Sequence, residues 1–437
     1  MEKNSRLISV VLVLILVSLT SYASAETLNI SSNFTIATNI ANPITGEMPG
    51  KSALGFDGTN YFLVSCRADF AFTNIFGVQI SIDGEILNTF PIANINPVYG
   101  CTNQRPSVAF DGTNYLVVFS RVTENGSTEI AGAFVSPSGA INNSLEGFSI
   151  ISDVSDAPDV AFDGSNYLVV SAKYNDNTLH DIYGARVNTD GHVLGEFLIF
   201  SAQGGQVMPS IAFDGSNYLV IWSDTRSGSP VGPDADIYGA RVAPTGTVLD
   251  PEGIPISTAQ GAQEWPRIIF DDKNYFAVWE DTRNGPEVFP PVLDIFGTRI
   301  TPAGVILDGN TNTGGIAINT HPLPQQHPIA SFDGKNYVVA WEMSFFYDPP
   351  SGIYAARVST DGFLLDVPPD AGGILIGQPS DYASRYVWPS SFSSENNILL
   401  AWIDNREVSD EAKDIYGVLI NPTTRNISMS WLMLLLD

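Results

Sequence analysis

One phrase recurs along the whole chain and limits what it can fold into. It reads "AFDGSNYLVIWSDTR" from Ala212, with close copies "AFDGTNYLVVFSR" from Ala109 and "SFDGKNYVVAWE" from Ser331. The asparagine of the phrase falls at Asn60, Asn114, Asn166, Asn217, Asn274, Asn336 and, in a degraded copy, Asn397. Successive spacings are 54, 52, 51, 57, 62 and 61 residues. Periods of this length are typical of propellers, solenoids and repeat arrays.

Each copy predicts four β-strands. In the fourth copy, "PSIAF" (209–213) and "YLVIW" (218–222) flank the turn "DGSN", and Asp-Gly sequences suit tight hairpins. "DIYGARV" (236–242) predicts the third strand, and "TVLDPEGIPIS" (247–257) contains the fourth. No segment after the N-terminal region has helical periodicity.

Seven copies of four antiparallel strands predict an all-β, seven-bladed β-propeller. A circle of blades has to be closed. The N-terminal "NFTIATNIANP" (33–43) resembles the end of an internal repeat, "EGIPISTAQGA" (252–262), and the seventh copy fades after "VLINPTTR". We therefore expect the N-terminal strand to complete the last blade beside the C-terminal strand, which leaves no open sheet edge in that blade.

The repeated phrase favours architecture over chemistry. Its aromatic and aliphatic residues suit the space between blades, and its Asp-Gly pair suits a chain reversal. The phrase shares an aspartate, a glycine and an aromatic residue with the Asp-box of sialidases, but not the serine, spacing and trailing Thr-Trp of that motif. In architecture, residues 26–437 resemble secreted repeat propellers of the sialidase-like or lectin-like kind. This resemblance implies the fold and carries over no functional residue.

The N-terminus has the pattern of an export signal. Lys3 and Arg6 precede an apolar run over 7–19, and "ASA" at 23–25 suits signal-peptidase cleavage. We expect a signal peptide over 1–25, a single mature domain over 26–437, and a secreted, periplasmic or cell-surface location. An uncleaved membrane anchor is the alternative; no later stretch is long and apolar enough to span a membrane.

The net charge and the two cysteines limit which molecules the protein is expected to bind. The chain has 47 acidic and 20 basic residues, a formal net charge of −27, which disfavours nucleic acid and anionic lipid. Cys66 and Cys101 are expected to form a disulfide in an exported protein. Two cysteines make no zinc site, and no "DxDxDG" calcium loop occurs, so we expect no bound metal. We also expect no cofactor and a monomeric protein.

Functional residues are expected where the copies differ, on the face that carries the loops between second and third strands and the loops leading into each blade. We call this the upper face. The residue before each blade's first proline, or its equivalent, is predicted to ring the central channel there: Lys51, Arg105, Ala157, Met208, Trp265, His327 and Trp388. The alternative for the two tryptophans is packing against adjoining blades.

Three copies carry an aspartate-arginine pair after the second strand. The sequences are "DTR" at 224–226, "DTR" at 281–283 and "DNR" at 404–406. Arg226, Arg283 and Arg406 could bind the carboxylate of an acidic sugar through paired hydrogen bonds. The favoured alternative is that each aspartate pairs with its own arginine and stabilises the repeat.

Aromatic residues gather in the long loops of the fifth, sixth and seventh copies. The candidates are Phe289, Phe345, Phe346, Tyr347, Tyr382, Tyr386 and Trp388. Flat aromatic faces stack on sugar rings and anchor protein contacts, so this part of the upper face is the preferred ligand site.

Three functions stay open at this stage. The favoured interpretation is a non-enzymatic module that binds an extracellular glycan or protein. The first alternative is a carbohydrate-active hydrolase or lyase with acids at the channel mouth, because glycosidases need two carboxylates. The second is a structural cell-surface protein. No "GxSxG" motif occurs, and His321 and His327 lack the acidic neighbours of a metal site.

Overall fold

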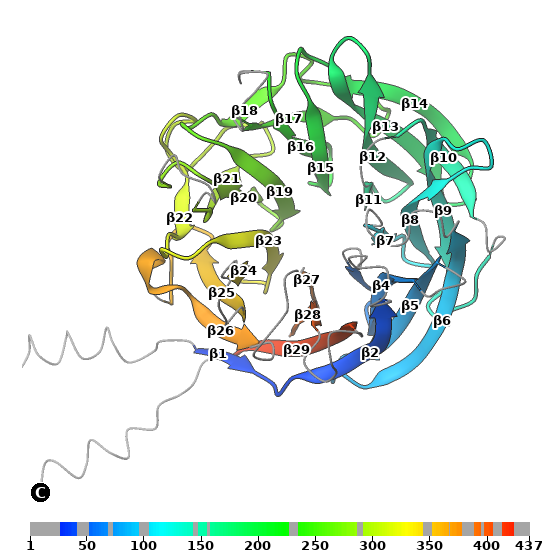
Figure 1. The fold of residues 1–437 in the computed structure, drawn as a ribbon, viewed down its shortest axis with the longest axis horizontal. Coiled ribbons are helices and arrows are strands. Elements are labelled where there is room, and N and C mark those ends of the chain that lie inside the picture. The colour runs from blue at the N-terminus through cyan, green and yellow to red at the C-terminus, as the bar shows by residue number, and fades with distance from the viewer. Residues whose placement is uncertain are drawn as a thin grey trace, which may run out of the picture.

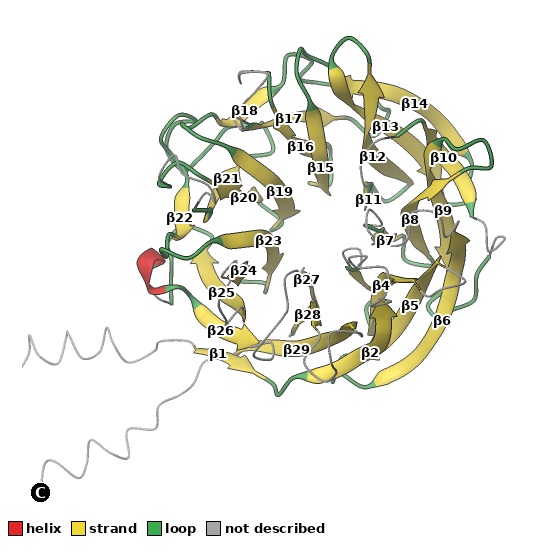
Figure 2. Ribbon diagram, viewed as in Figure 1, coloured by secondary structure: helices red, strands yellow, loops and turns green. Residues whose placement is uncertain are grey.

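The chain folds into seven antiparallel sheets arranged around a central axis (Figure 1). The computed structural model describes residues 27–41, 52–68, 73–95, 105–142, 147–154, 158–226, 235–285, 292–343, 352–366, 368–377, 389–394, 397–404 and 413–423. Almost all regular structure in these residues is strand, and Figure 2 shows one short helical turn, η2 (Pro369–Ala371). The prediction of an all-β, seven-bladed propeller is confirmed.

Six blades consist of four consecutive strands each. Blade 1 contains β3 (Ala53–Phe56), β4 (Asn60–Ala68), β5 (Thr73–Ser81) and β6 (Ile86–Ile95). Blade 2 contains β7 (Ser107–Phe110), β8 (Tyr115–Val122), β9 (Thr128–Val135) and β10 (Phe148–Ser152). Blade 3 contains β11 (Asp159–Phe162), β12 (Asn166–Asn175), β13 (Leu179–Asn188) and β14 (Val193–Phe200).

The next three blades repeat this order, and the first strand of each lies nearest the axis (Figure 1). Blade 4 contains β15 (Gln206–Phe213), β16 (Tyr218–Asp224), β17 (Asp236–Val242) and β18 (Ile254–Ser257). Blade 5 contains β19 (Gln263–Phe270), β20 (Tyr275–Asp281), β21 (Asp294–Ile300) and β22 (Ile316–Asn319). Blade 6 contains β23 (Gln325–Phe332), β24 (Asn336–Met343), β25 (Gly352–Ser359) and β26 (Ile374–Gly377).

Blade 7 joins the two ends of the chain. Its inner strands are C-terminal: β27 (Ser390–Ser393), β28 (Ile398–Asp404) and β29 (Lys413–Thr423). Its outer edge is N-terminal, because β1 (Thr27–Ile30) and β2 (Phe34–Ala41) both pair antiparallel with β29. The register sets Ile30 opposite Ile420 and Phe34 opposite Gly417. The predicted closure by the N-terminal strand is therefore confirmed.

The aspartate of the repeated phrase builds the turn. In blade 3, Asp163 Oδ1 accepts hydrogen bonds from the backbone N–H groups of Ser165 (2.8 Å) and Asn166 (2.7 Å). Gly164 between them has φ +89°, a left-handed conformation that glycine adopts without strain. The same two contacts recur at Asp57, Asp111, Asp214, Asp271 and Asp333.

The tyrosine of the phrase joins neighbouring blades. Tyr218 and Tyr275 are buried and donate their hydroxyl groups to the backbone oxygens of Asn166 (3.1 Å) and Asn217 (2.9 Å), each in the turn of the preceding blade. Buried tryptophans and aliphatic residues fill the remaining space between sheets. The structure thus assigns the phrase to architecture, as the sequence favours.

Replacing Asp163 with alanine tests this turn. We expect the free energy of unfolding to fall by about 1–2 kcal/mol, because two backbone donors lose their acceptor. Chemical denaturation of the variant and wild type measures the difference. Asp190→Ala is the control, since Asp190 is an exposed turn residue that only donates its backbone N–H to Asn188. Equal losses in the two variants would refute the capping role.

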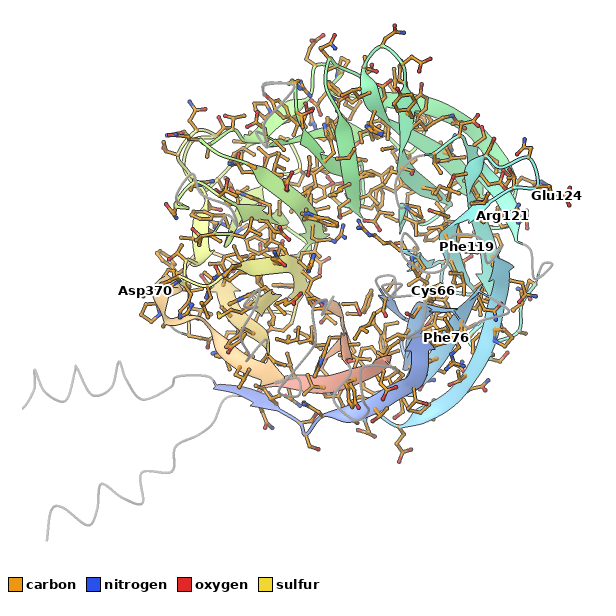
Figure 3. All side chains as sticks on the ribbon, in the orientation of Figure 1. Cys66, Phe76, Phe119, Arg121, Glu124 and Asp370 are labelled. Atoms are coloured by element: carbon orange, nitrogen blue, oxygen red, sulfur yellow. The ribbon has the colours of Figure 1, made fainter. Side chains whose placement is uncertain are left out.

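Two predictions about the N-terminal half reach beyond the described residues. Residues 1–25 lie outside them, so the signal peptide stays a prediction. Cys66 is buried in β4 among the side chains between blades 1 and 2, where Figure 3 also places Phe119. Cys101 lies outside the described residues, so the disulfide also stays a prediction. None of the helical structure in the described ranges is long and apolar enough to cross a membrane.

Candidate functional site

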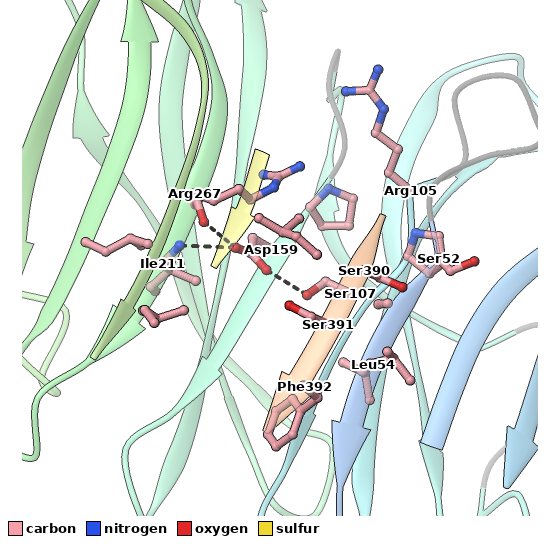
Figure 4. A pocket seen from close by; sticks show the side chains of 18 of the residues that line it. Ser52, Leu54, Arg105, Ser107, Asp159, Ile211, Arg267, Ser390, Ser391 and Phe392 are labelled. Carbon is pink, nitrogen blue, oxygen red and sulfur yellow. Dashed lines mark hydrogen bonds between the residues drawn. The ribbon is translucent and has the colours of Figure 1, made fainter. Parts of the chain in front are cut away.

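A polar cavity of about 250 Å³ lies on the axis. Residues from the first strand of every blade line it. Figure 4 shows Arg105 and Arg267 towards one end, Asp159 and Ser107 deeper, and Phe392 at the other end. Asp159 accepts hydrogen bonds from the hydroxyl of Ser107 (2.7 Å) and the backbone N–H of Ile211 (3.1 Å). We call the end lined by Arg105 and Met208 the mouth.

Three blades present an unusual backbone at this level. Met208, Trp265 and His327 have φ values of 58°, 57° and 56°. Each residue lies in a β-bulge of its first strand, immediately before a proline. Left-handed backbone is costly for bulky side chains and concentrates at functional sites. In each bulge the residue before the proline departs from the regular sheet pattern of its blade.

Buried glutamines fix the loops that lead into these three blades. Gln206, Gln263 and Gln325 have no exposed surface. Their side-chain amides donate to backbone oxygens of the loops leading into the blades, at Gly204 (3.1 Å), Gly261 (2.9 Å) and His321 (2.8 Å). The same construction therefore precedes the bulge in all three blades, where the bulge residue differs in chemistry.

Acidic residues cluster between blades 5 and 6. Glu264 of β19 is directly opposite Glu280 of β20, and directly opposite residues in an antiparallel pair have Cα atoms about 4.5–5.5 Å apart. Glu280 is only 4% exposed, whereas Glu264 is partly exposed. Glu342 is fully buried at the equivalent position of β24.

His327 connects two of these carboxyl groups. Its backbone N–H donates to Glu280 Oε1 at 2.7 Å, across the gap between the blades. Its ring Nδ1 lies 3.2 Å from Glu342 Oε2 within its own blade. We call Glu264, Glu280, His327 and Glu342 the mouth cluster.

Burial changes the protonation of the cluster. Loss of solvation raises the pKa of Glu280 to about 8; the neighbouring Glu264 also raises it, while the His327 N–H and the charge of Arg267 oppose the rise. Burial also raises the pKa of Glu264. Glu280 therefore holds a proton at neutral pH, and the two facing carboxyl groups differ in their exposure to solvent.

Arg105 and Trp265 meet across the axis. The guanidinium carbon of Arg105 lies 4.4 Å from the centre of the Trp265 ring. Arg105 precedes β7 of blade 2, whereas Trp265 belongs to blade 5. The Trp265 ring also meets the His327 ring edge-on, with centroids 5.5 Å apart. Arg105 and Arg267 line the cavity, and Trp265, through its contacts with Arg105 and His327, connects the mouth cluster to this end of it.

Two of the predicted binding arginines form ion pairs with their own aspartates. Arg283 makes two hydrogen bonds to Asp281, at 2.9 and 2.6 Å, and Arg226 lies 2.5 Å from Asp224. Each aspartate also accepts from the indole N–H of a buried tryptophan in its blade. This geometry agrees with the structural interpretation of the pair; a ligand role for either arginine stays a prediction.

Other predicted site residues cannot be placed. Those outside the described residues are Lys51, Ala157, Phe289, Phe345, Phe346, Tyr347, Tyr382, Tyr386, Trp388 and Arg406. The aromatic part of the upper face accordingly stays a prediction. Within the described ranges, no group of three or more His, Cys, Asp or Glu side chains is arranged to hold a metal ion.

The glutamates of the mouth cluster are absent from the sequence-based candidates. A signal for two of them exists in the repeat. Glu280 and Glu342 follow the tryptophan of the second strand, and the other copies carry Cys66, Ser120, Ala172, Ser223 and Ile403 at this position. The other copies have a small or apolar residue at this buried strand position. Burying a carboxyl group there costs folding free energy, which distinguishes these two blades from the rest.

The raised pKa of Glu280 predicts a stability that depends on pH. An unfolded glutamate has a pKa near 4.3, so between about pH 4.3 and 8 the folded protein binds more protons at this group than the unfolded chain does. Stability from this group is complete below that window and is lost as pH rises through about 8. We expect wild type to lose about 2–4 kcal/mol more than Glu280→Gln between pH 5 and 8.5. Denaturation at both pH values measures the difference, and identical pH dependence of the two proteins would contradict it.

Comparison with known proteins supports the fold. No protein-family description and no curated protein matches the chain. Among solved structures, the endosialidase of phage phi92 matches with a TM-score of 0.51 at 8% identity, over 92% of this chain and 70% of that one. An α-L-arabinanase from Penicillium chrysogenum matches with a TM-score of 0.48 at 12% identity, over 72% and 94%. The propeller domain of the Trilobed protease from Pyrococcus furiosus matches with a TM-score of 0.43 at 11% identity, over 88% and 99%.

This comparison corrects the function favoured by the sequence. The sequence favours a non-enzymatic binding module, whereas the solved propeller that is similar over 92% of this chain is an endosialidase. That interpretation is wrong in light of this finding, and the carbohydrate-active enzyme takes its place as the hypothesis to test. Because the likeness is one of fold, the activity has to be argued from the site.

Proposed function

We propose that this protein is a carbohydrate-active hydrolase that cleaves a glycosidic bond at the mouth, between blades 5 and 6. The observation that carries the proposal is the facing pair Glu264 and Glu280, which differ in burial. Glycoside hydrolysis requires one protonated and one ionised carboxyl group on either side of the bond that breaks. Environments that separate the protonation of two neighbouring carboxyl groups are a mark of such sites.

Each residue has a separate role in this reaction. Glu280, protonated at neutral pH, donates its proton to the glycosidic oxygen as the bond to the anomeric carbon breaks. Glu264, the more exposed carboxyl, stabilises the positive charge that develops on the sugar. It then either bonds to the anomeric carbon or accepts a proton from the attacking water. The anomer first formed, observed by proton NMR, distinguishes these two routes.

Two further features support a sugar substrate. Trp265 offers a flat apolar ring beside the carboxyl pair, and such rings stack on sugar faces. The likeness to the phage phi92 endosialidase extends over most of the chain, so a fold of this kind is compatible with glycan cleavage.

A substrate screen tests the proposal. Purified protein is incubated with 4-methylumbelliferyl glycosides that include sialosides, arabinofuranosides and neutral hexosides, and with unbranched polysaccharides analysed by reducing-end assay. We expect hydrolysis of at least one class. The Glu264→Gln, Glu280→Gln double variant is the control for contaminating activity. Unchanged product formation by the double variant, or no hydrolysis of any substrate, would overturn the proposal.

Export of the protein is part of the same proposal, because the protein has to leave the cell to reach an extracellular glycan. Cleavage after Ala25 leaves Glu26 as the first residue, and the two cysteines form a disulfide. We expect N-terminal sequencing of secreted protein to begin at Glu26. We also expect thiol labelling of the denatured, unreduced protein to modify neither cysteine. A retained N-terminus or two labelled thiols would contradict these expectations.

A further inference from the structure

The contact between Arg105 and Trp265 has features of a ligand site occupied by the protein itself. A guanidinium is a flat, polar group that covers part of the area of a sugar ring. The guanidinium of Arg105 lies over the ring face of Trp265, which is partly exposed. Among the tryptophans that the structure describes, Trp222, Trp279, Trp341 and Trp402 are buried in the core. Trp265 differs from them because its backbone turns it towards the mouth in a left-handed bulge.

The position of the contact adds a second observation. Blades 2 and 5 are not neighbours: blades 3 and 4 separate them on one side, and blades 6, 7 and 1 on the other. The side chains of Arg105 and Trp265 therefore meet across the axis. Arg105 also lines the cavity and lies towards one end of it (Figure 4), so its contact with Trp265 is made beside that end.

We propose that the Trp265 ring is a stacking subsite for a sugar residue of the substrate, and that Arg105 covers this subsite until the sugar displaces it. The inference rests on the proposed function, since it places the sugar beside the mouth cluster through the edge-on contact of Trp265 with His327. Once the sugar has displaced Arg105, the guanidinium can pair with a carboxylate of the sugar. An acidic sugar therefore regains the free energy lost when the Arg105–Trp265 contact breaks, whereas a neutral sugar does not.

The energies of the contacts give the direction of the effects. A cation–π contact of this kind has to be broken before a sugar can stack, which weakens observed binding by about threefold to tenfold. Removing the guanidinium strengthens the binding of a neutral sugar by that factor. Removing the indole weakens binding by more than about tenfold, because the stacking surface is lost.

The test measures binding separately from catalysis. In a Glu280→Gln background, which keeps probes intact, calorimetry gives the Kd of arabinotriose as a neutral probe and sialyllactose as an acidic probe. Arg105→Met keeps an unbranched, flexible side chain but removes the guanidinium and its charge. We expect it to lower the Kd of arabinotriose threefold to tenfold and to raise or leave unchanged that of sialyllactose. Trp265→Ala abolishes measurable binding of both, and Trp265→Phe retains part of it.

A matched control and a spectroscopic measurement complete the test. Arg67→Met removes another guanidinium stacked on an aromatic ring, that of Phe76 at 5.0 Å, which does not line the cavity. It should leave both Kd values unchanged. The ¹⁹F resonance of 5-fluorotryptophan at position 265, assigned with Trp265→Phe, should shift on Arg105→Met and again on addition of arabinotriose.

Several outcomes would overturn the inference. Weaker binding of both probes to Arg105→Met would make Arg105 a direct ligand rather than a cover. Wild-type affinity of Trp265→Ala, an unmoved ¹⁹F resonance, or binding of neither probe would remove the subsite. The proposed function fails in a different way, through lack of hydrolysis by the wild-type protein, so the two failures are distinguishable.

Discussion

Replacing Glu280 with glutamine is expected to lower the rate of glycoside hydrolysis at pH 7 by about 10²- to 10⁴-fold. Glutamine matches glutamic acid in size and still accepts the His327 N–H, but it cannot give up a proton to the leaving oxygen. The rate constant for a 4-methylumbelliferyl glycoside found in the screen is the measurement. Substrates with better leaving groups, which need less protonation, should lose less rate.

The pH profile separates an acid catalyst from a merely structural group. With a pKa of about 8, Glu280 remains protonated across neutral pH, so kcat/KM of the wild type should fall as pH rises through about 8. In Glu280→Gln this alkaline fall should disappear. An intact alkaline limb in the variant would assign the proton donor elsewhere.

A matched buried glutamate controls for loss of stability. Glu129 of blade 2 is 8% exposed and forms an ion pair with Arg121 at 2.6 Å, but it lies outside the mouth cluster. Glu129→Gln should lower the unfolding free energy and leave kcat/KM unchanged. A comparable loss of rate in both variants would point to general destabilisation rather than to a role of Glu280 in the reaction.

Deleting residues 27–41 is expected to lower the melting temperature by more than about 10 °C or to prevent soluble folding. The deletion removes β1 and β2, so β29 becomes an unpaired edge and the apolar contacts of Ile36 in blade 7 are lost. Exposed strand edges pair with other chains. Thermal unfolding and size-exclusion chromatography measure stability and aggregation.

A rearranged chain provides the control for this deletion. Thr27 pairs with Thr423, so the two strands end beside each other. Moving 27–41 behind residue 423 through a short hairpin linker rebuilds blade 7 from continuous chain. We expect this permuted protein to regain the melting temperature of the wild type to within a few degrees. Failure of the permuted protein to fold would show that closure depends on more than the pairing with β29.

The repeat accounts for most of what could be predicted of the fold. Asp163 and its equivalents form the same turn in six blades, and Tyr218 and Tyr275 bond to the equivalent asparagine of the preceding blade, so both residue types recur at regular spacing in the sequence. The fourth strands are less regular in sequence. Correspondingly, β18 covers only Ile254–Ser257, which is shorter than the segment expected from the sequence.

The candidate site could be predicted only in part. Of the residues at the variable position before the proline, Arg105 and Met208 line the cavity, and their role in binding stays a prediction. The pairing of Glu264 with Glu280 depends on strand register across a bulge, and the contact of Glu280 with His327 depends on how two blades approach. Neither contact can be recognised from a spacing between residues in the sequence, because the partners come from different strands.

The amino-acid sequence by itself determined the number of blades, the hairpin turns and the meeting of the two chain ends, because each requires the same local chemistry in copy after copy. The tertiary structure alone decided which unlike residues meet at the axis. It placed a charged side chain from blade 2 over an indole from blade 5, and a backbone N–H from blade 6 on a carboxyl group from blade 5. These contacts are made once, between segments far apart in the chain, and their burial sets the protonation on which the proposed chemistry depends.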